Sequence, residues 1–131
     1  MLYELYTGKI LFSGDTNNDM LRLIMEVKGN FSVKLLKKAK FSSEHFDEHN
    51  VFEHTRVDPT TRYTYKTKIQ FDKPTKDLYS MLKQYTSPTV TEQEIRKLRQ
   101  LADLIGQCLT LDTSKRPSVD QLMLHPFIKD D

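Results

Sequence analysis

The sequence predicts a mainly α-helical fold that carries one small β-hairpin. Along most of the 131-residue chain, apolar residues recur at the i, i+3, i+4 spacing of a single helix face. Capping residues, glycines and prolines divide these stretches into separate short helices. Residues 30–74 differ, because this part is polar and its only clear period is the alternation of a strand.

The first expected helix covers residues 2–7, where Leu2, Leu5 and Tyr6 share one face and Thr7-Gly8 marks a turn. No capping residue precedes Leu2, so we expect the chain to begin inside a helix. An apolar face left uncovered at this point would favour a homodimer through the exposed N-terminal segment.

Four further helices are marked by start and stop signals. Thr16-Asn17-Asn18-Asp19 resembles a capping box, and Gly29 is a suitable stop. Thr91-Glu92-Gln93-Glu94 and Ser118-Val119-Asp120-Gln121 are capping boxes. The expected helices lie near 16–28, 76–85, 92–110 and 118–125. Their core-facing residues are expected to be Met20, Leu21, Leu23, Ile24 and Val27, then Leu78, Met81, Leu82 and Tyr85, then Ile95, Leu98, Ala102, Ile105 and Leu109, and finally Val119, Leu122 and Met123.

A β-hairpin is expected near 51–71, within an insertion at about 30–90 on the helical scaffold. Residues 51–57 form its first strand, Asp58-Pro59-Thr60-Thr61 supplies the turn, and aromatic or apolar residues alternate with basic ones over 62–71. Two explanations fit this alternation. It is typical of a half-buried strand with lysines on its solvent-exposed face, and it would also suit a surface that stacks the bases and neutralises the phosphates of single-stranded RNA.

Composition narrows the classes of partner. Lys and Arg number 20 against 18 Asp and Glu, so the charge is mixed and nucleic-acid binding is not expected. No apolar run approaches the roughly 18 residues of a membrane span, and no signal-peptide pattern is present, so we expect an intracellular protein without a membrane partner.

Two patterns that suggest a nucleotide or a nucleophile have simpler explanations. Gly8-Lys9 is not a P-loop, because Tyr3 and Ile10 stand where that motif needs glycine and Ser or Thr. Cys108 has no basic residue within one helical turn to lower the pKa of its thiol, so we expect a buried structural side chain.

The stretch SEHFDEHNVFEH raises the question of a metal site. It gathers His45, Asp47, His49 and His54 with three glutamates. Imidazole and carboxylate groups bind zinc, but this spacing matches no closed zinc site. We expect a solvated acidic loop and assign no metal ligand.

The C-terminal stretch LTLDTSKRPSVDQLMLHPFI resembles the end of a eukaryotic protein kinase catalytic domain. That family follows a long helix with Leu-X-X-Asp-Pro-X-X-Arg and a short capped helix that closes in His-Pro-Phe. Thr113 departs from the usual Pro, and Ser13 also stands where Pro is common. The matching residues are Leu109, Asp112, Arg116, Ser118, His125, Pro126 and Phe127.

Within the kinases, the chain is most similar to the pre-mRNA-processing (splicing) family of the cyclin-dependent and dual-specificity group. YELYTGKILF, TNNDMLRLIMEVKG, FDEHNVF and PTKDL carry this resemblance. It implies that residues 1–131 are a partial catalytic domain, the C-terminal part of the large lobe. It further implies a nuclear Ser/Thr kinase that transfers the ATP γ-phosphate to splicing factors.

The resemblance assigns no catalytic, cofactor-binding or metal residue to this chain. The sequence contains no GxGxxG, no HRD and no DFG, which phosphoryl transfer by this family requires. ATP and Mg would belong to the complete kinase, and the chain alone is expected to be inactive. Arg116 matches an arginine that forms a structural ion pair with the glutamate of an Ala-Pro-Glu segment absent here.

Two functions follow from these observations. In the first, the chain supplies scaffold and substrate-side surface to a kinase, with the missing upstream part of the domain and splicing-type proteins as its partners. In the second, it is a stand-alone, non-catalytic protein- or RNA-binding module.

Overall fold

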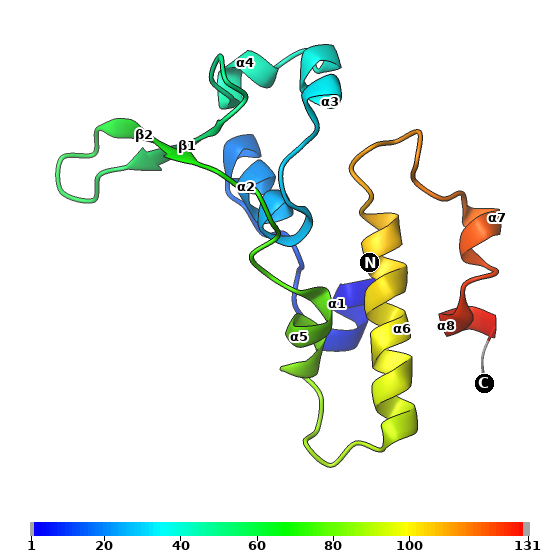
Figure 1. Ribbon diagram of the computed structural model, residues 1–131. Helices are drawn as coiled ribbons and strands as arrows, with labels where there is room; N and C mark the ends of the chain where they lie inside the picture. Colours follow the sequence, from blue (N-terminus) through cyan, green and yellow to red (C-terminus); the bar gives the residue numbers. More distant parts are fainter. Residues whose placement is uncertain (1, 130–131) are drawn as a thin grey trace. The chain divides into compact units, whose positions relative to one another are not determined.

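The computed structural model describes residues 2–129 and confirms a mainly helical chain with one two-stranded antiparallel hairpin (Figure 1). The described residues form two compact units. One is Phe12–Thr75, and the other combines residues 2–11 with 76–129. Each unit has its own buried side chains. No helix among residues 2–129 has the length and apolar character that a membrane span needs.

The unit Phe12–Thr75 begins with α2 (Asn17–Lys28), close to its predicted bounds. The Thr16 side chain accepts a hydrogen bond from the Asp19 amide, which is half of the expected capping box. Gly29 ends the helix at φ +79°, and its N–H donates to the Met25 carbonyl over 2.8 Å. A left-handed φ at this position favours glycine, which confirms the predicted stop.

Two short helices follow that the sequence did not predict, α3 (Val33–Lys38) and α4 (Ser42–His45). Ser32 caps α3 by accepting from the Leu35 amide, but α4 has no side-chain cap. Both helices are too short to show a hydrophobic period, and isolated helices of this length are unstable in water. They depend on tertiary contacts.

The hairpin pairs β1 (Phe52–Val57) with β2 (Thr64–Ile69), and the register runs from Phe52 opposite Ile69 to Val57 opposite Thr64. The Asp58 amide donates to the Tyr63 carbonyl at 2.9 Å, and Arg62 adopts φ +63° to close the turn. The predicted hairpin and its turn are therefore confirmed. Figure 1 shows its tip extending beyond the helices of this unit.

The core of Phe12–Thr75 is largely aromatic. Phe46 and Phe52 meet edge to face with ring centroids 5.6 Å apart, and Phe52 lies 6.1 Å from Phe71. Met25 is completely buried, although the predicted stripe of α2 left it out. The stripe residues Met20, Leu21, Leu23 and Ile24 are only half-buried. The core consists of Met25, Leu36, Phe46, Phe52 and Phe71.

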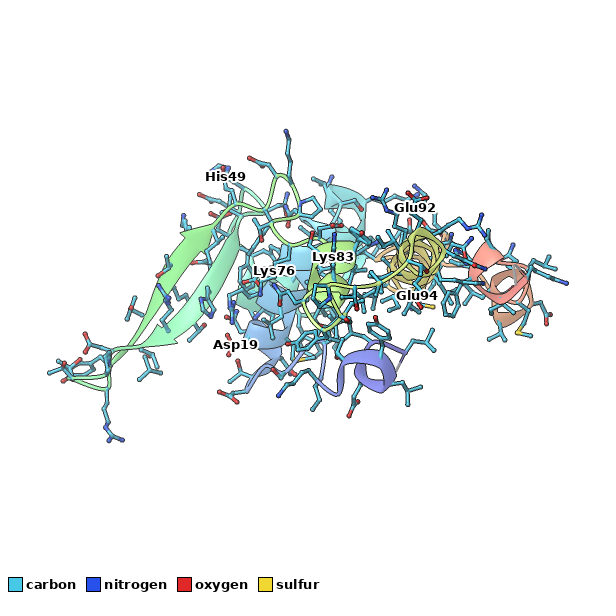
Figure 2. All side chains as sticks on the ribbon, turned by 90° about the horizontal axis from the view of Figure 1, so that it is seen from below. Asp19, His49, Lys76, Lys83, Glu92 and Glu94 are labelled. Atoms are coloured by element: carbon cyan, nitrogen blue, oxygen red, sulfur yellow. The ribbon has the colours of Figure 1, made fainter. Side chains whose placement is uncertain are left out.

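The second unit is helical: α1 (Leu2–Thr7), α5 (Leu78–Lys83), α6 (Glu92–Cys108), α7 (Val119–Leu122) and α8 (Pro126–Lys129). α5 packs on α6, α1 contacts α5, and α8 contacts α6. The predicted capping box at the start of α6 is present, because Thr91 accepts from the Glu94 amide and the Glu94 side chain accepts from the Thr91 amide. Figure 2 shows α6 end-on, with Glu92 and Glu94 of its first turn labelled.

Several expectations for this unit need correction. Tyr85, Val119 and Met123, which were expected to face the core, are 47%, 74% and 53% exposed. Tyr3 is the buried residue of α1, whereas Leu5 of the expected apolar face is 82% exposed. The helix expected over 118–125 ends at Leu122, and a new helix, α8, begins at Pro126. Proline has no N–H to donate and is well suited to a first helical position, so here it starts a helix. The buried face of α6 also includes Leu101 and Leu104.

Candidate functional site

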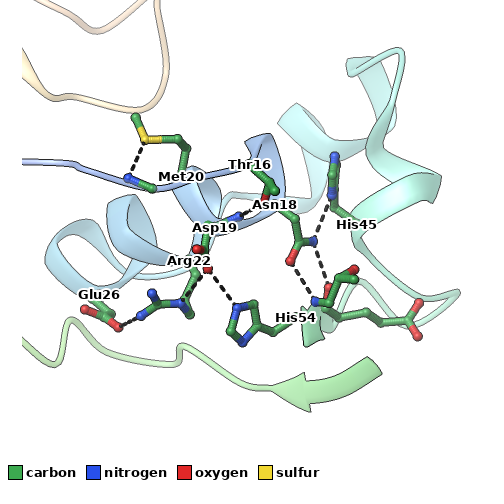
Figure 3. A network of polar contacts seen from close by, with 11 residues as sticks. Thr16, Asn18, Asp19, Met20, Arg22, Glu26, His45 and His54 are labelled. Atoms are coloured by element: carbon green, nitrogen blue, oxygen red, sulfur yellow. Dashed lines mark hydrogen bonds and ion pairs between the residues drawn. The ribbon is translucent and has the colours of Figure 1, made fainter. Parts of the chain in front are cut away.

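Asn18, in the first turn of α2, closes the free edge of strand β1 (Figure 3). Its Oδ1 accepts from the Thr55 amide at 2.8 Å, and its Nδ2 donates to the Glu53 carbonyl at 2.9 Å. The side-chain amide thus replaces the backbone of a third strand at an edge that would otherwise be open to pairing. Nδ2 also lies 2.9 Å from Nδ1 of His45, which links the end of α4 to the same point.

The neighbouring residue Asp19 binds a side chain of the same strand, that of His54. Nε2 of His54 donates to Asp19 Oδ1 over 2.9 Å, and Arg22 reaches the same oxygen at 3.4 Å. Arg22 also forms a 2.6 Å ion pair with Glu26 one turn further along α2. The hydrogen bond from His54 is the main cause that lowers the pKa of Asp19. The anionic carboxylate is therefore the form that the folded unit favours.

A second carboxylate, Asp47, organises the turn that leads into β1. Its Oδ1 accepts from the amides of His49 at 2.8 Å and Val51 at 2.9 Å, and Lys68 of β2 lies 3.0 Å from Oδ2. These bonds, the Val51 amide first, lower the pKa of Asp47 to about 2. Asn50 adopts φ +62° inside this turn.

The histidine-rich stretch is thus only partly a solvated loop. His45, Asp47 and His54 bond to different partners within the unit. Of the three histidines only His49 is exposed, beside the exposed Glu48. No three metal-binding side chains come together among residues 2–129. The expectation of a solvated acidic loop was wrong for His54, which is buried and bonds to Asp19 35 positions away. It was also wrong for Asp47, whose carboxylate is bonded to the nearby His49 and Val51 amides and to Lys68 of β2.

In the other unit, the segment after α6 is held by local bonds around Asp112. Its Oδ1 accepts from the Ser114 amide at 3.0 Å and from the Ser114 hydroxyl at 2.7 Å. Nε of Arg116 donates to the Thr110 carbonyl at 2.9 Å, and the Arg116 side chain is exposed. The ion pair expected for Arg116 needs a glutamate outside this sequence, so that role stays a prediction.

The predicted capping box at Ser118 is present, because Ser118 accepts from the Gln121 amide and the Gln121 side chain accepts in return. Cys108, at the last position of α6, is half-buried and not fully buried as expected.

His125 joins the C-terminal helices to α6. It is buried, its Nδ1 accepts from the Phe127 amide at 3.0 Å, and its Nε2 lies 2.6 Å from Oδ2 of Asp103. Because Nδ1 accepts, the proton is on Nε2 and is donated to Asp103. Lys97 adds a bond to the Phe127 carbonyl at 2.9 Å and lies 5.4 Å from the centre of the Phe127 ring. Sequence spacing did not indicate the partners Asp103 and Lys97.

The sequence is similar to two known serine/threonine protein kinases. The chain is 46% identical to serine/threonine-protein kinase prp4 of Schizosaccharomyces pombe over 126 residues, which are 96% of the chain. It is 43% identical over 128 residues, 98% of the chain, to serine/threonine-protein kinase prpf4B of Dictyostelium discoideum. Over nearly its whole length the chain is therefore similar to a part of serine/threonine protein kinases of the prp4 type.

The match extends over a limited part of each of these two kinases. The chain spans 26% of the length of the S. pombe kinase and 16% of the D. discoideum kinase. A shorter similarity, 59% identity over 29 residues, links it to mitogen-activated protein kinase kinase kinase 1a of Physcomitrium patens, and covers 22% of the chain and 4% of that protein. No family model matches the sequence.

Proposed function

We propose that this chain forms the C-terminal part of the large lobe of a Ser/Thr kinase catalytic domain. The observation that carries the proposal is a sequence identity of 43–46% to two serine/threonine kinases over nearly all of its residues. The hydrogen-bonded segment after α6 supports it, because Asp112, Arg116 and His125 of the kinase-like motif all have structural bonds. The complete kinase would transfer the ATP γ-phosphate to Ser or Thr of splicing proteins in the nucleus.

The contribution of the chain to that reaction is structural. Phosphoryl transfer depends on positioned groups that hold the phosphates and Mg²⁺ and that orient the acceptor hydroxyl. The corresponding motifs are absent from the 131-residue sequence, so we assign none of its residues to catalysis, ATP or metal. α6 and the segment bonded to it provide the scaffold, and the unit Phe12–Thr75 provides surface for protein substrates.

A chimaeric kinase tests this proposal. The matching segment of S. pombe prp4 is replaced by residues 1–131, and phosphate transfer to an Arg/Ser-rich peptide is measured with Mg-ATP. We expect the chimaera to be active, and a matched deletion of the segment to be inactive. The isolated chain should transfer no labelled phosphate and show no saturable binding at millimolar ATP. A folded but inactive chimaera, or specific ATP binding by the chain alone, would contradict the proposal.

A stand-alone binding module is the second candidate function. The observation that favours it is that Phe12–Thr75 has its own core and presents exposed tyrosines on its hairpin. This function predicts an inactive chimaera together with an isolated chain that binds a partner.

A further inference from the structure

The outer half of the hairpin is exposed on both faces. Phe52, at the inner end of β1, is 1% exposed, whereas Val57, at the outer end of the same strand, is 59% exposed. On β2, Tyr65 is 47% exposed, and Tyr63 just before the strand is 77% exposed. The explanation of the aromatic and basic alternation as a half-buried strand therefore holds only for the inner residues of the hairpin. Figure 2 shows the side chains of the outer end extending into open space around the ribbon.

Three cations accompany these tyrosines, namely Arg56, Arg62 and Lys66. None of them forms an ion pair with another residue in the described range 2–129, whereas Lys68 further in is paired with Asp47. Arg56 lies directly opposite Tyr65 in the ladder. Side chains in such pairs project from the same face, with Cβ atoms about 4.5–5.5 Å apart.

The single carboxylate of this region does not neutralise the three cations. Asp58 is turned inward to the loop backbone, where its Oδ1 accepts from the amides of Thr60 at 2.8 Å and Thr61 at 3.1 Å. The outer hairpin thus combines a positive charge excess with two flat, exposed aromatic rings.

We propose that the outer hairpin, residues 55–66, binds single-stranded nucleic acid. Phosphates would pair with Arg56, Arg62 and Lys66, and unpaired bases would stack on Tyr63 and Tyr65. An acidic peptide would use the cations but leave the tyrosines without a flat partner. A duplex keeps its bases stacked on one another and so offers them no base face. This inference is independent of the proposed kinase function.

Three phosphate contacts predict weak, salt-dependent binding, with a dissociation constant of about 1–100 μM and a slope of log K against log salt near −2. The probe is a fluorescein-labelled oligouridylate of about 12 nucleotides, which is a typical length for such a surface, and binding is followed by anisotropy. A deoxythymidylate of the same length determines whether RNA or DNA is preferred.

The variants separate stacking from charge. Tyr63→Ala and Tyr65→Ala should each weaken binding at least about fivefold, while the matching Phe variants, which keep the ring, should bind like the original. Arg56→Gln, Arg62→Asn and Lys66→Gln together should bring the salt slope close to zero. Asn is chosen at position 62 because it tolerates the left-handed φ of +63° there.

The matched control removes three exposed lysines of α3 in the same unit, Lys34→Gln, Lys37→Gln and Lys38→Gln. We expect this control to bind nearly as well as the original chain, and circular dichroism verifies that every variant is folded. The proposal is overturned if oligonucleotide binding does not saturate or if the Tyr→Ala variants bind as tightly as the original. It is also overturned if the α3 control loses as much affinity as the hairpin variants. Equal binding of a duplex or of a phosphorylated acidic peptide of the same charge would also overturn it.

Discussion

The Nε2 atom of His54 lies 2.9 Å from a carboxylate oxygen of Asp19, and this bond fastens the inner end of the hairpin to the first turn of α2. Asp19 and His54 are 35 positions apart in the sequence. The bond therefore belongs to the tertiary structure of Phe12–Thr75, and the stability of this unit should depend on it.

Asp19→Asn is expected to lower the free energy of unfolding near neutral pH by about 1–2 kcal/mol, because a charged acceptor is lost from a partly buried hydrogen bond. The folded pKa of Asp19 lies below its ordinary value of 3.8. The stabilisation is therefore complete above that value and disappears as the pH falls through the folded pKa.

Urea denaturation at several pH values measures this effect. The difference between the original chain and Asp19→Asn should narrow as the solution is acidified below about pH 4. Asp15→Asn, an exposed change just before α2, is the control and should have little effect. A difference that does not depend on pH would show that the carboxylate charge is not responsible.

Asp47→Asn is expected to loosen the turn before β1. The carboxylate accepts from two amides and pairs with Lys68, and a neutral amide oxygen accepts more weakly. The amides of His49 and Val51 should exchange faster with solvent deuterium near neutral pH, as measured by NMR.

The pH dependence of this second carboxylate follows from its pKa, which falls from 3.8 in the free state to about 2 in the folded chain. The contribution of Asp47 to stability should therefore be lost as the pH falls from about 4 to about 2. Glu48→Gln is the matched control, because the Glu48 side chain is 86% exposed. Comparable amide exchange in both variants would contradict the role given to Asp47.

Replacing each of two glycines with alanine should change the stability of the chain in opposite directions. Gly29→Ala should destabilise the chain by about 1–2 kcal/mol, because an L side chain at φ +79° is strained. A Cβ there would lie 3.5 Å from Cδ of Pro74, which is ordinary contact, so the penalty comes from the backbone.

Gly106→Ala should instead stabilise α6 by up to about 1 kcal/mol, because alanine is the better helix former. The added Cβ would lie 3.7 Å from Cδ1 of Leu78, without a clash. Urea midpoints of the two variants test both expectations, and shifts of the same sign would contradict them.

Arg116→Ala should have different effects in the isolated chain and in a complete kinase. This prediction rests on the proposed function. In the isolated chain Arg116 is exposed and donates a hydrogen bond to the Thr110 carbonyl, so the change should alter stability by no more than about 0.5 kcal/mol. In the chimaeric kinase the expected glutamate would lose its partner, and activity should fall at least about tenfold. Lys115→Ala, an exposed neighbour, is the control. Equal activities of the two chimaeric variants would remove the ion-pair role.

Local signals in the sequence predicted the helix starts well. The capping boxes at Thr91 and Ser118 need only four consecutive residues, so their partners are visible in the sequence itself. The hairpin was predictable for the same reason, because alternation and turn residues are local. α3 and α4 were missed because Leu36 and Phe46 stabilise them through contacts with distant residues of the core.

The hydrogen bonds that Asn18 and Asp19 make to His45, His54 and the backbone of β1 could not be predicted from sequence spacing. Asn18 and His45 are 27 positions apart, and Asn18 bonds to the backbone of Thr55 from 37 positions away. Single histidines and acids in a polar stretch do not reveal which of them will be buried. The burial of His54 became evident only when the strand register placed it on the face that meets α2.

The division of the chain has an evolutionary consequence. Phe12–Thr75 is one uninterrupted stretch, while the other unit is assembled from the residues on both sides of it. α1 and α5, which flank this stretch in the sequence, contact each other directly. Two crossovers, one at each boundary, would therefore exchange the hairpin-bearing unit between genes and leave the helices around α6 unchanged.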